Sequence, residues 1–390
     1  MINTLIQYYL AFFVNTQFYS MGTFKLLFVG YVFLTYFFIE RKSSIGKYPL
    51  LLFFLFLYGT TVAILFMLID THAYNDMYAI YLRVRLMLIE LSFAIALYIY
   101  LQKKSIDYIL KLLLIGIMAN ALVGTLQFIH TPFERVSMLF SEPSAAGYYY
   151  LFIFFILYEK FKHGWPMLIS RYFMFLGLAI GSKAQYVLLL AVGVLNYLSP
   201  RRLILFLTVL ISLTYLFRTE IMSIPAVKYN LYVAEVYMDQ GLRGFKTQNR
   251  VWNTYSTRIA AIEGSIRCIA QNPLGIGFGS FNSWFRVHMA NTGLDNPETN
   301  AIIAGKLYAS SKSNLLELFV ATGIFGIAIY FYIANYFYRY RHQHGYLFKS
   351  FVMMTLASLF IELSPMFIYL TILWVLLEKE HQNNQIEKNL

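Results

Sequence analysis

Long apolar runs separated by short polar segments fill most of the chain up to about residue 377. A helix that crosses a bilayer needs about 20 mainly apolar residues, and with that criterion we predict about twelve transmembrane helices. They are Leu5–Tyr19, Gly22–Ile39, Tyr48–Ile69, Ile80–Leu101, Tyr108–Ile129, Ala145–Tyr158, Met167–Gly181, Ala184–Leu198, Leu203–Phe217, Asn314–Tyr338, Leu347–Glu362 and Met366–Leu377. The pattern therefore predicts an all-α polytopic membrane protein.

Positive charge recurs on alternate connections between these helices. The basic connections contain Arg41, Lys42 and Lys47; Lys103 and Lys104; Lys160, Lys162 and Arg171; Arg201 and Arg202; and Arg339, Arg341 and Lys349. The intervening connections at 70–76 and 182–183 carry little positive charge. Because lysine and arginine concentrate in cytoplasmic loops, we expect both termini in the cytoplasm and the long segment between 218 and 313 outside it.

This arrangement divides the chain into four regions. They are transmembrane helices one to nine within 1–217, a large extracytoplasmic loop over 218–313, transmembrane helices ten to twelve within 314–377, and a polar, solvated cytoplasmic tail over 378–390. Within the loop, Asn249–Gln271 is predicted to be a helix. Its isoleucines are spaced to form one apolar face, and they are Ile259, Ile262, Ile266 and Ile269. Pro273 should end this helix, because the residue before a proline is disfavoured in helical conformation.

Composition agrees with a membrane protein and limits its chemistry. The chain is 59% hydrophobic and 13% charged, against about 25% charged residues in soluble proteins. The first apolar run lacks the basic start and small-residue cleavage site of a signal peptide, so we expect it to remain in the protein. A single cysteine, Cys268, excludes an internal disulfide and a cysteine-based metal site. The net charge of +12 is assigned to loops that face anionic lipids, not to nucleic-acid binding.

No cofactor is expected from the motifs. The histidines have no metal-ligand spacing, no Asp-x-Asp pair lies outside the membrane, and no Gly-Lys-Ser/Thr phosphate loop is present. Gly275, Gly277 and Gly279 form a Gly-x-Gly-x-Gly segment. Backbone N–H groups of such a segment can approach a phosphate, but a tight turn that returns the loop to the membrane is the favoured interpretation.

Arginines provide the clearest candidate chemistry. Arg250, Arg258, Arg267 and Arg286 lie in the external loop, and Arg83 and Arg85 lie near the outer end of the fourth predicted span. Ionisable groups at membrane depth generally face a cavity or a partner. Glu90 is one candidate partner for Arg83, which leaves a structural ion pair as open as a ligand site. Several arginines that converge on one cleft would suit an anionic, phosphate-bearing ligand.

Two further positions carry alternatives. Ser141 or Glu142 can cap the helix that starts at Pro143, since proline suits a first helical turn. Glu142 could instead bind a sugar hydroxyl or act as a base. Lys183, between two apolar helices, either extends its ammonium to the interface or adds to an anion site.

Four segments, taken in order, resemble motifs of the O-antigen polymerase/ligase superfamily, in particular its Wzy-type polymerases. Arg135…Phe140-Ser-Glu142-Pro-Ser144 resembles Arg-x-x-Gly-x-Phe-x-Glu-Pro-Ser, and Gly181-Ser-Lys183-Ala184 resembles Ser-Arg-Gly/Ala. Arg258 with Pro273–Phe281 resembles Arg…Pro-x-x-Gly-x-Gly-x-x-x-Phe, and Ser313–Gly326 resembles Asn-x-x-Leu…Glu-x-Gly-x-x-Gly. The sequence departs from the family where Met138 replaces a glycine and Lys183 an arginine. It also lacks the histidine that ligase members carry before Asn314.

The resemblance implies a GT-C-like fold and a metal-independent glycosyltransferase at the outer face of a bacterial cytoplasmic (inner) membrane. Such an enzyme joins undecaprenyl-pyrophosphate-linked oligosaccharide units into O-antigen, capsule or exopolysaccharide. Its partners would be that lipid-linked substrate, membrane lipids, a flippase and a chain-length regulator. By this resemblance Arg258 is the first catalytic candidate, with Glu142 and its rival His288 for the acceptor hydroxyl. The substrate-binding candidates are Arg135, Lys183, Arg286, Arg250, Arg83 and Arg85.

Two other functions remain open from the sequence. One is an O-antigen-type ligase that transfers finished glycan to another acceptor. The other is a transporter of lipid-linked oligosaccharides, for which two related halves with broken helices at matching positions are typical. The chain shows no such half-to-half similarity, which favours the polymerase.

Overall fold

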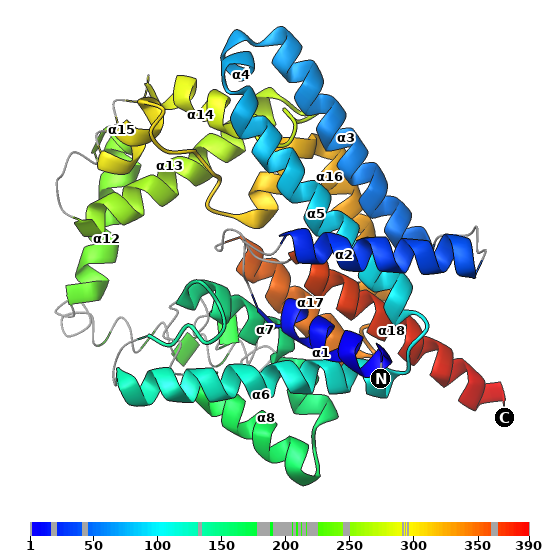
Figure 1. Ribbon diagram of the computed structural model, residues 1–390. Helices are drawn as coiled ribbons and strands as arrows, with labels where there is room; N and C mark the ends of the chain where they lie inside the picture. The colour runs from blue at the N-terminus through cyan, green and yellow to red at the C-terminus, as the bar shows by residue number, and fades with distance from the viewer. Residues whose placement is uncertain are drawn as a thin grey trace.

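The computed structural model describes residues 2–16, 22–40, 46–131, 135–177, 225–244, 250–290, 296–359 and 366–389, with isolated residues between them. The regular elements in these ranges are helices (Figure 1). The all-α class predicted from the apolar runs is therefore confirmed for the described part of the chain.

Four helices are long and apolar enough to cross a membrane: α3 (Lys47–Ile69), α5 (Met77–Leu101), α6 (Ile106–His130) and α16 (Asn314–Arg339). They coincide with four of the predicted spans. The other described helices of the predicted transmembrane regions are shorter or partly polar, namely α1 (Ile2–Val14), α2 (Gly22–Phe33), α7 (Pro143–Lys160), α8 (Gly164–Leu176), α17 (Gly345–Ser358) and α18 (Met366–Asn389). The predicted spans at 184–198 and 203–217 lie outside the described residues except at isolated positions. Within the described residues the structure thus shows four candidate membrane-spanning helices, and the other eight predicted spans stay predictions.

Polar contacts hold several helix ends together at one end of the bundle. Tyr98, near the end of α5, donates a hydrogen bond of 3.0 Å to Glu378 of α18. Lys160, the last residue of α7, forms an ion pair with Glu380, which also belongs to α18. The basic connections after α5 and α7, which lie far apart in sequence, therefore meet at the same end, as their alternation predicted.

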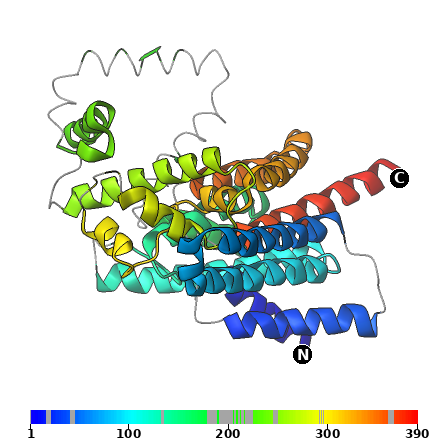
Figure 2. The same ribbon diagram turned by 90° about the horizontal axis from the view of Figure 1, so that it is seen from above.

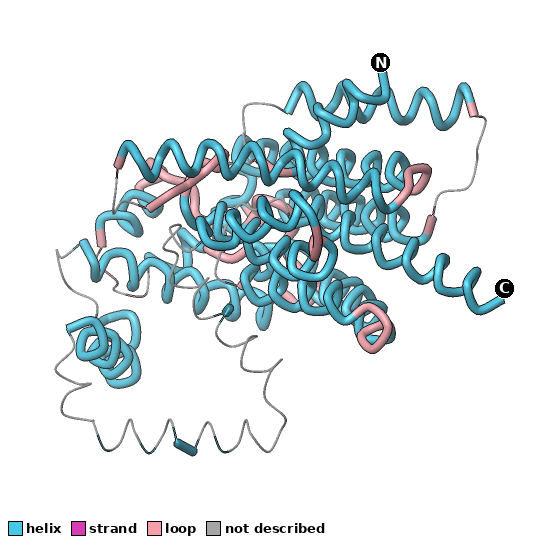
Figure 3. Tube along the Cα trace, turned by 90° about the horizontal axis from the view of Figure 1, so that it is seen from below, coloured by secondary structure: helices cyan, strands magenta, loops and turns pink. Residues whose placement is uncertain are grey.

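Beyond α4 (Thr71–Asn75), at the other end of α3 and α5, lie α13 (Arg250–Gln271), α14 (Phe281–Ala290) and α15 (Pro297–Ile303) (Figure 1, upper left). They belong to the predicted external loop, which is thus largely helical. In perpendicular views α12 (Pro225–Gln240) stands apart from the main group of helices, while α1 and α2 lie on the opposite side of that group (Figures 2 and 3).

Helix α13 confirms the helix predicted over Asn249–Gln271, and its apolar face in part. Ala260, Ala261 and Cys268 are buried, whereas Ile266 is 56% exposed. Small residues allow close approach of the neighbouring helix: a β-carbon on Gly264 would lie 3.0 Å from the ring of Phe285 on α14. The predicted isoleucine face is therefore confirmed only in part: Ile259 and Ile269 pack, half-buried, against the core of this layer, whereas Ile266 is exposed and small residues form the fully buried contact.

The glycine-rich segment 275–279 enters a break in α16. Gly323 interrupts that helix with φ 54° and ψ −142°. The N–H groups of Ile276 and Gly277 donate to the carbonyls of Val320 and Ala321, at 3.0 and 2.8 Å. In return, Ile324 N–H donates to the carbonyl of Pro273 at 2.8 Å. Backbone groups freed by the break are thus bonded again within the protein, as a membrane interior requires.

These bonds decide between the two interpretations of the glycines. Gly275, Gly277 and Gly279 all have φ between 83° and 85°. A β-carbon on Gly277 would lie 2.1 Å from the backbone of Ala63 on α3. Because the segment packs against α3 and the N–H groups of residues 275–278 all bond backbone carbonyls of the protein, the tight turn is confirmed and these groups are not available to a phosphate.

Helix α18 extends past its predicted end at Leu377. Glu378 accepts hydrogen bonds from Tyr98, Gln102 and Trp374, and Glu380 is only 8% exposed. The prediction of a solvated tail was wrong for these first residues, because their carboxylates have donors on neighbouring helices.

Candidate functional site

Two ion pairs join the N-terminal half of α5 and its N-cap residue, Asp76, to other helices. Asp76 Oδ1 lies 2.8 Å from Arg286 Nη1 of α14, and Arg83 pairs with Glu317 of α16. Asp76 and Arg83 are seven positions apart, about two turns along one face of the helix. All four side chains are at least two thirds buried, with 13% exposure for Asp76 and 32% for Arg286. This row of charges, which we call the α5 charge row, joins α5, α14 and α16.

Local backbone structure brings α14 to this row. Gly279 precedes α14, and a β-carbon there would lie 2.7 Å from Ile80 Cα and 3.0 Å from Arg83 Cβ. The Asn282 amide then donates a hydrogen bond of 2.9 Å to Asp76 Oδ2, while its Oδ1 accepts one of 2.7 Å from Ala309 N–H. The close approach at Gly279 therefore sets the position from which Arg286 reaches Asp76.

Two neighbouring hollows lie beside the charge row. One, of about 390 Å³, is lined by His72, Asp76, Ser283, Arg286, Val287, Ala290 and Ile303. The other, of about 250 Å³, is lined by Asp70, His72, Gln271, Trp284, Val287 and His288. Because His72 and Val287 belong to both, Arg286 and His288 face adjacent spaces on α14.

His288 has the environment of a neutral imidazole. Its ring stacks on Trp284 at 4.8 Å between centroids, with 19° between the planes. Burial lowers the pKa of His288, and the positive charge of Arg267 lowers it further, against an opposing effect of Glu263. Its buried Nε2 has no hydrogen-bond partner among the described residues. A neutral imidazole can accept a proton near neutral pH, as a general base must.

Arg258 lies on α13, away from the two hollows. It is an exposed residue of α13, next to the buried Thr257. It precedes Gln271, which lines the His288 hollow, by thirteen positions, or about 20 Å of helix. The structure therefore places Arg258 on the helix that borders the site but at a distance from its hollows. Arg250 is the first residue of α13, and its side chain lies outside the described residues, as does all of Lys183.

Arg135 and Glu142 belong to a segment that folds back along α6. Gln127 Oε1 accepts hydrogen bonds from the N–H groups of Ser137 and Met138, at 3.1 and 2.8 Å. Both Arg135 and Glu142 are exposed. Glu142 occupies the N-cap position of α7, with proline next to it as predicted, but its side chain makes no capping hydrogen bond. The capping role predicted for the Glu142 carboxylate was therefore wrong.

Two arginines of α5 have different surroundings from those expected. Arg83 pairs with Glu317 and not with Glu90, which pairs instead with Lys25 of α2. Glu90 does not pair with Arg83 because it lies about two turns further along α5 than Arg83, at the level of α2. Arg85 is exposed, and two positions along a helix turn it about 200° away from Arg83. It therefore lies outside the charge row.

The sequence interpretation missed Asp76 and the pairing role of Glu317. Asp76 was part of a connection noted only for its lack of positive charge. Glu317 lies in the first turn of an otherwise apolar helix, and an ionisable group in such a helix is a usable signal for a partner or a site.

Among the described residues, no group of three histidine, cysteine or acidic side chains could hold a metal ion. Comparison of the chain with protein-family models, with curated proteins and with solved structures finds no match.

Proposed function

We propose that the protein is a Wzy-type polymerase that joins undecaprenyl-pyrophosphate-linked oligosaccharide units on the outer face of a bacterial cytoplasmic membrane. In this proposal α13–α15 and the N-terminal half of α5 form the external, substrate-binding side. A flippase supplies the lipid-linked units, a chain-length regulator limits the product, and membrane lipids surround the apolar helices.

The observation that carries the proposal is the backbone at Met138. This residue has φ 53°, in the left-handed region that glycine adopts without steric cost. Met138 stands where the motif of the polymerase family has glycine. A glycine position of the motif thus coincides with a backbone conformation that favours glycine. This agreement supports the resemblance of the segment to the polymerase motif independently of its sequence.

The α5 charge row supports the chemistry of the proposal. In the proposed reaction an acceptor hydroxyl attacks the anomeric carbon of the donor unit. The bond from that carbon to the pyrophosphate oxygen breaks, and undecaprenyl pyrophosphate leaves. Arg286, beside its 390 Å³ hollow, is suited to stabilise the charge that develops on the departing pyrophosphate. Arg83, Arg258 and Arg135 are further candidates for binding the substrate.

The proton of the acceptor hydroxyl needs a base. His288 is now the preferred candidate over Glu142, because its pKa is lowered by burial and it lies on α14 with Arg286. Glu142 is exposed on the α6–α7 segment. For that reason we assign it, with Arg135, to acceptor orientation.

One observation favours a transporter of lipid-linked oligosaccharides as the second candidate. Helix α16 is broken at Gly323, and broken membrane helices are typical of transporters. In transporters, however, such breaks occur at matching positions of two repeats. Here the break is filled by the glycine-rich segment, whose N–H groups bond α16 itself, so the polymerase is the better-supported function.

The test is the surface-polysaccharide profile of a host strain that lacks this gene, complemented with wild type, Arg258→Ala, Arg286→Ala or Arg85→Ala. We expect single repeat units in the deletion, long chains with wild type and with the control Arg85→Ala, and loss of long chains with Arg286→Ala at unchanged membrane level. Arg258→Ala tests the role implied by the family resemblance.

Other outcomes would replace the proposal. Long polymer that persists in the deletion without attachment to its final acceptor would identify an O-antigen-type ligase. Lipid-linked units that accumulate on the cytoplasmic face of the membrane would identify the transporter.

A further inference from the structure

A third cavity, of about 930 Å³, lies at the basic end of the bundle, away from the α5 charge row. Its apolar side is formed on α7 by Tyr150, Phe154, Phe155 and Tyr158. Its polar rim comes mainly from the end of α7, the start of α17 and α18. None of the residues assigned to saccharide transfer lines this space.

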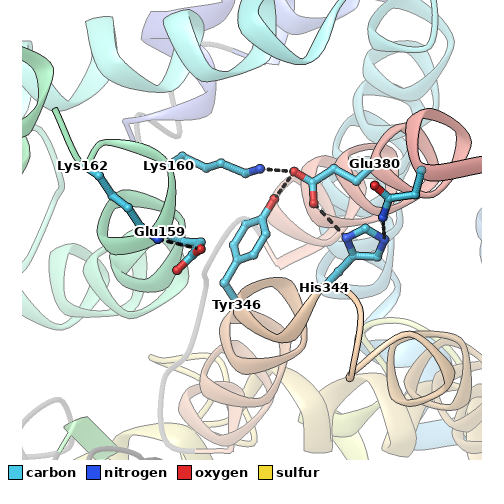
Figure 4. A network of polar contacts seen from close by, with 7 residues as sticks. Glu159, Lys160, Lys162, His344, Tyr346 and Glu380 are labelled. Atoms are coloured by element: carbon cyan, nitrogen blue, oxygen red, sulfur yellow. Dashed lines mark hydrogen bonds and ion pairs between the residues drawn. The ribbon is translucent and has the colours of Figure 1, made fainter. Parts of the chain in front are cut away.

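Glu380 of α18 organises the rim (Figure 4). Its Oε1 accepts a hydrogen bond of 2.6 Å from the Tyr346 hydroxyl and pairs with Lys160. Its Oε2 lies 2.9 Å from His344 Nδ1. His344 is 4% and Glu380 8% exposed. A buried carboxylate with three partners is a fixed part of the structure, and its charge is balanced by Lys160.

One positive charge on the rim is not balanced in this way. Glu159 pairs with Lys162 at 2.9 Å, so both carboxylates of the rim have a lysine. Among the described residues, the contact of the Lys349 ammonium on α17 is with the ring of Phe155, whose centroid lies 5.7 Å away. No carboxylate of the described residues pairs with Lys349. The rim therefore attracts a single negative charge.

The rest of the cavity suits an acyl chain. From Tyr158 to Tyr150 the apolar wall follows α7 for eight positions, or about 12 Å towards the middle of the bundle. Tyrosines and lysines at its mouth, such as Tyr158, Tyr346 and Lys160, are the residue types enriched at a membrane–water interface. A basic rim next to an apolar wall is complementary to an amphiphile that carries a phosphate headgroup and an acyl chain.

We propose that this cavity binds one anionic membrane phospholipid, with the headgroup phosphate at Lys349 and an acyl chain along the α7 wall. Basic pockets between membrane helices bind acidic lipid headgroups in this manner. The site is independent of the proposed polymerase activity, and the bound lipid would join α7, α17 and α18 at one end of the bundle.

The test is native mass spectrometry of the full chain in detergent, with dioleoyl phosphatidylglycerol or dioleoyl phosphatidylcholine added at equal concentration. We expect one retained phosphatidylglycerol and weaker retention of phosphatidylcholine. Lys349→Gln should weaken phosphatidylglycerol binding about fivefold, which corresponds to about 1 kcal/mol for one lysine near an anionic headgroup. Lys349→Arg should retain the lipid, and Lys47→Gln, an exposed lysine at the start of α3, is the matched control.

Three results with the variants above would overturn the proposal, and a fourth comes from a further variant. The first is equal retention of both lipids by wild type, and the second is an equal loss in Lys349→Gln and Lys47→Gln. The third is binding of glycerol 3-phosphate as tight as that of phosphatidylglycerol, which would identify a site for a soluble phosphate. A further variant, Phe155→Leu, keeps an apolar wall, so it should retain the preference for phosphatidylglycerol. Loss of that preference would also contradict the assignment of phosphate to Lys349.

Discussion

Arg83 of α5 forms an ion pair with Glu317 of α16, and the pair joins α5 to the part of α16 that precedes the break at Gly323. Both side chains are largely buried, at 17% and 15% exposure. Since the segment of α16 before Gly323 is separated from the rest of the helix by non-helical backbone, this pair is one of the contacts that fix its direction.

Removal of one partner of this pair should therefore destabilise the protein more than removal of both. Arg83→Met or Glu317→Met leaves a charge without its opposite partner and should each lower stability by about 3–5 kcal/mol, while the double variant should recover most of that loss. The measurement is a double-mutant cycle of SDS-induced unfolding of the purified protein. A double variant as unstable as the sum of the two single variants would show that the side chains act independently.

The glycine-rich segment makes a steric prediction. Gly277→Ala places a methyl group 2.1 Å from the backbone of Ala63, so α3 or the segment must move, and the bonds to α16 should be lost. We expect little folded protein in the membrane fraction after purification. Gly241→Ala is the control, because Gly241 also has a positive φ, of 60°, but open space around it. It should lose only about 1–2 kcal/mol of conformational energy. Equal yields for the two variants would contradict the packing described for Gly277.

Sequence predicted the positions of helices better than the faces by which they pack. The long helices and α13 followed from length and from the helix-ending Pro273, which are local properties. The face by which α13 packs followed only in part: Ile259 and Ile269 pack against the core, but hydrophobicity ranks the exposed Ile266 above the buried Ala260, whereas close helix packing selects the smaller residue. Side-chain size alone does not show which neighbour a helix approaches.

Long-range ion pairs were beyond local reasoning for a different reason. Asp76 and Arg286 are 210 positions apart, and their contact depends on the turn at Gly279. The arginines could be identified from sequence as candidates for binding an anion, because charge at membrane depth is costly. Their carboxylate partners could be found only from the folded arrangement, as the wrong pairing of Arg83 with Glu90 illustrates.

The small-residue face of α13 can be tested directly. Ala260 is fully buried, so Ala260→Leu should overpack the contact and cost about 1–3 kcal/mol. Ile266→Ala removes a side chain that is 56% exposed and should change stability by no more than about 0.5 kcal/mol. Thermal unfolding followed by tryptophan fluorescence measures both. The reverse order of effects would show that Ile266, and not Ala260, belongs to the packing surface.

Protonation of His288 should destabilise the protein in mild acid. Its pKa in the folded state is below the ordinary value because of burial, so the unfolded chain binds the proton more strongly. The stabilising contribution is present above a pH of about 6.5, the unfolded pKa. It is lost as the pH falls from there through the folded pKa. The unfolding temperature of wild type should therefore decrease between pH 8 and pH 5 by more than that of His288→Asn, which has no titrating group. If the unfolding temperatures of wild type and His288→Asn decrease equally with pH, the pKa of His288 does not differ between the folded and unfolded states.

An exchange of the two charges of the Arg286–Asp76 pair can distinguish a structural role of Arg286 from a substrate-binding role. Asp76→Arg combined with Arg286→Asp keeps an ion pair between α14 and the start of α5 but moves the guanidinium to the other helix. If Arg286 stabilises the departing pyrophosphate, the exchanged protein should fold, reach the membrane at wild-type level and still fail to make long polysaccharide. Loss of a preorganised charge of this kind costs about 10²- to 10³-fold in rate, which is enough to leave only single repeat units on a gel. Restoration of long chains by the exchange would instead show that the pair is structural, and the search for the pyrophosphate contact would move to Arg258.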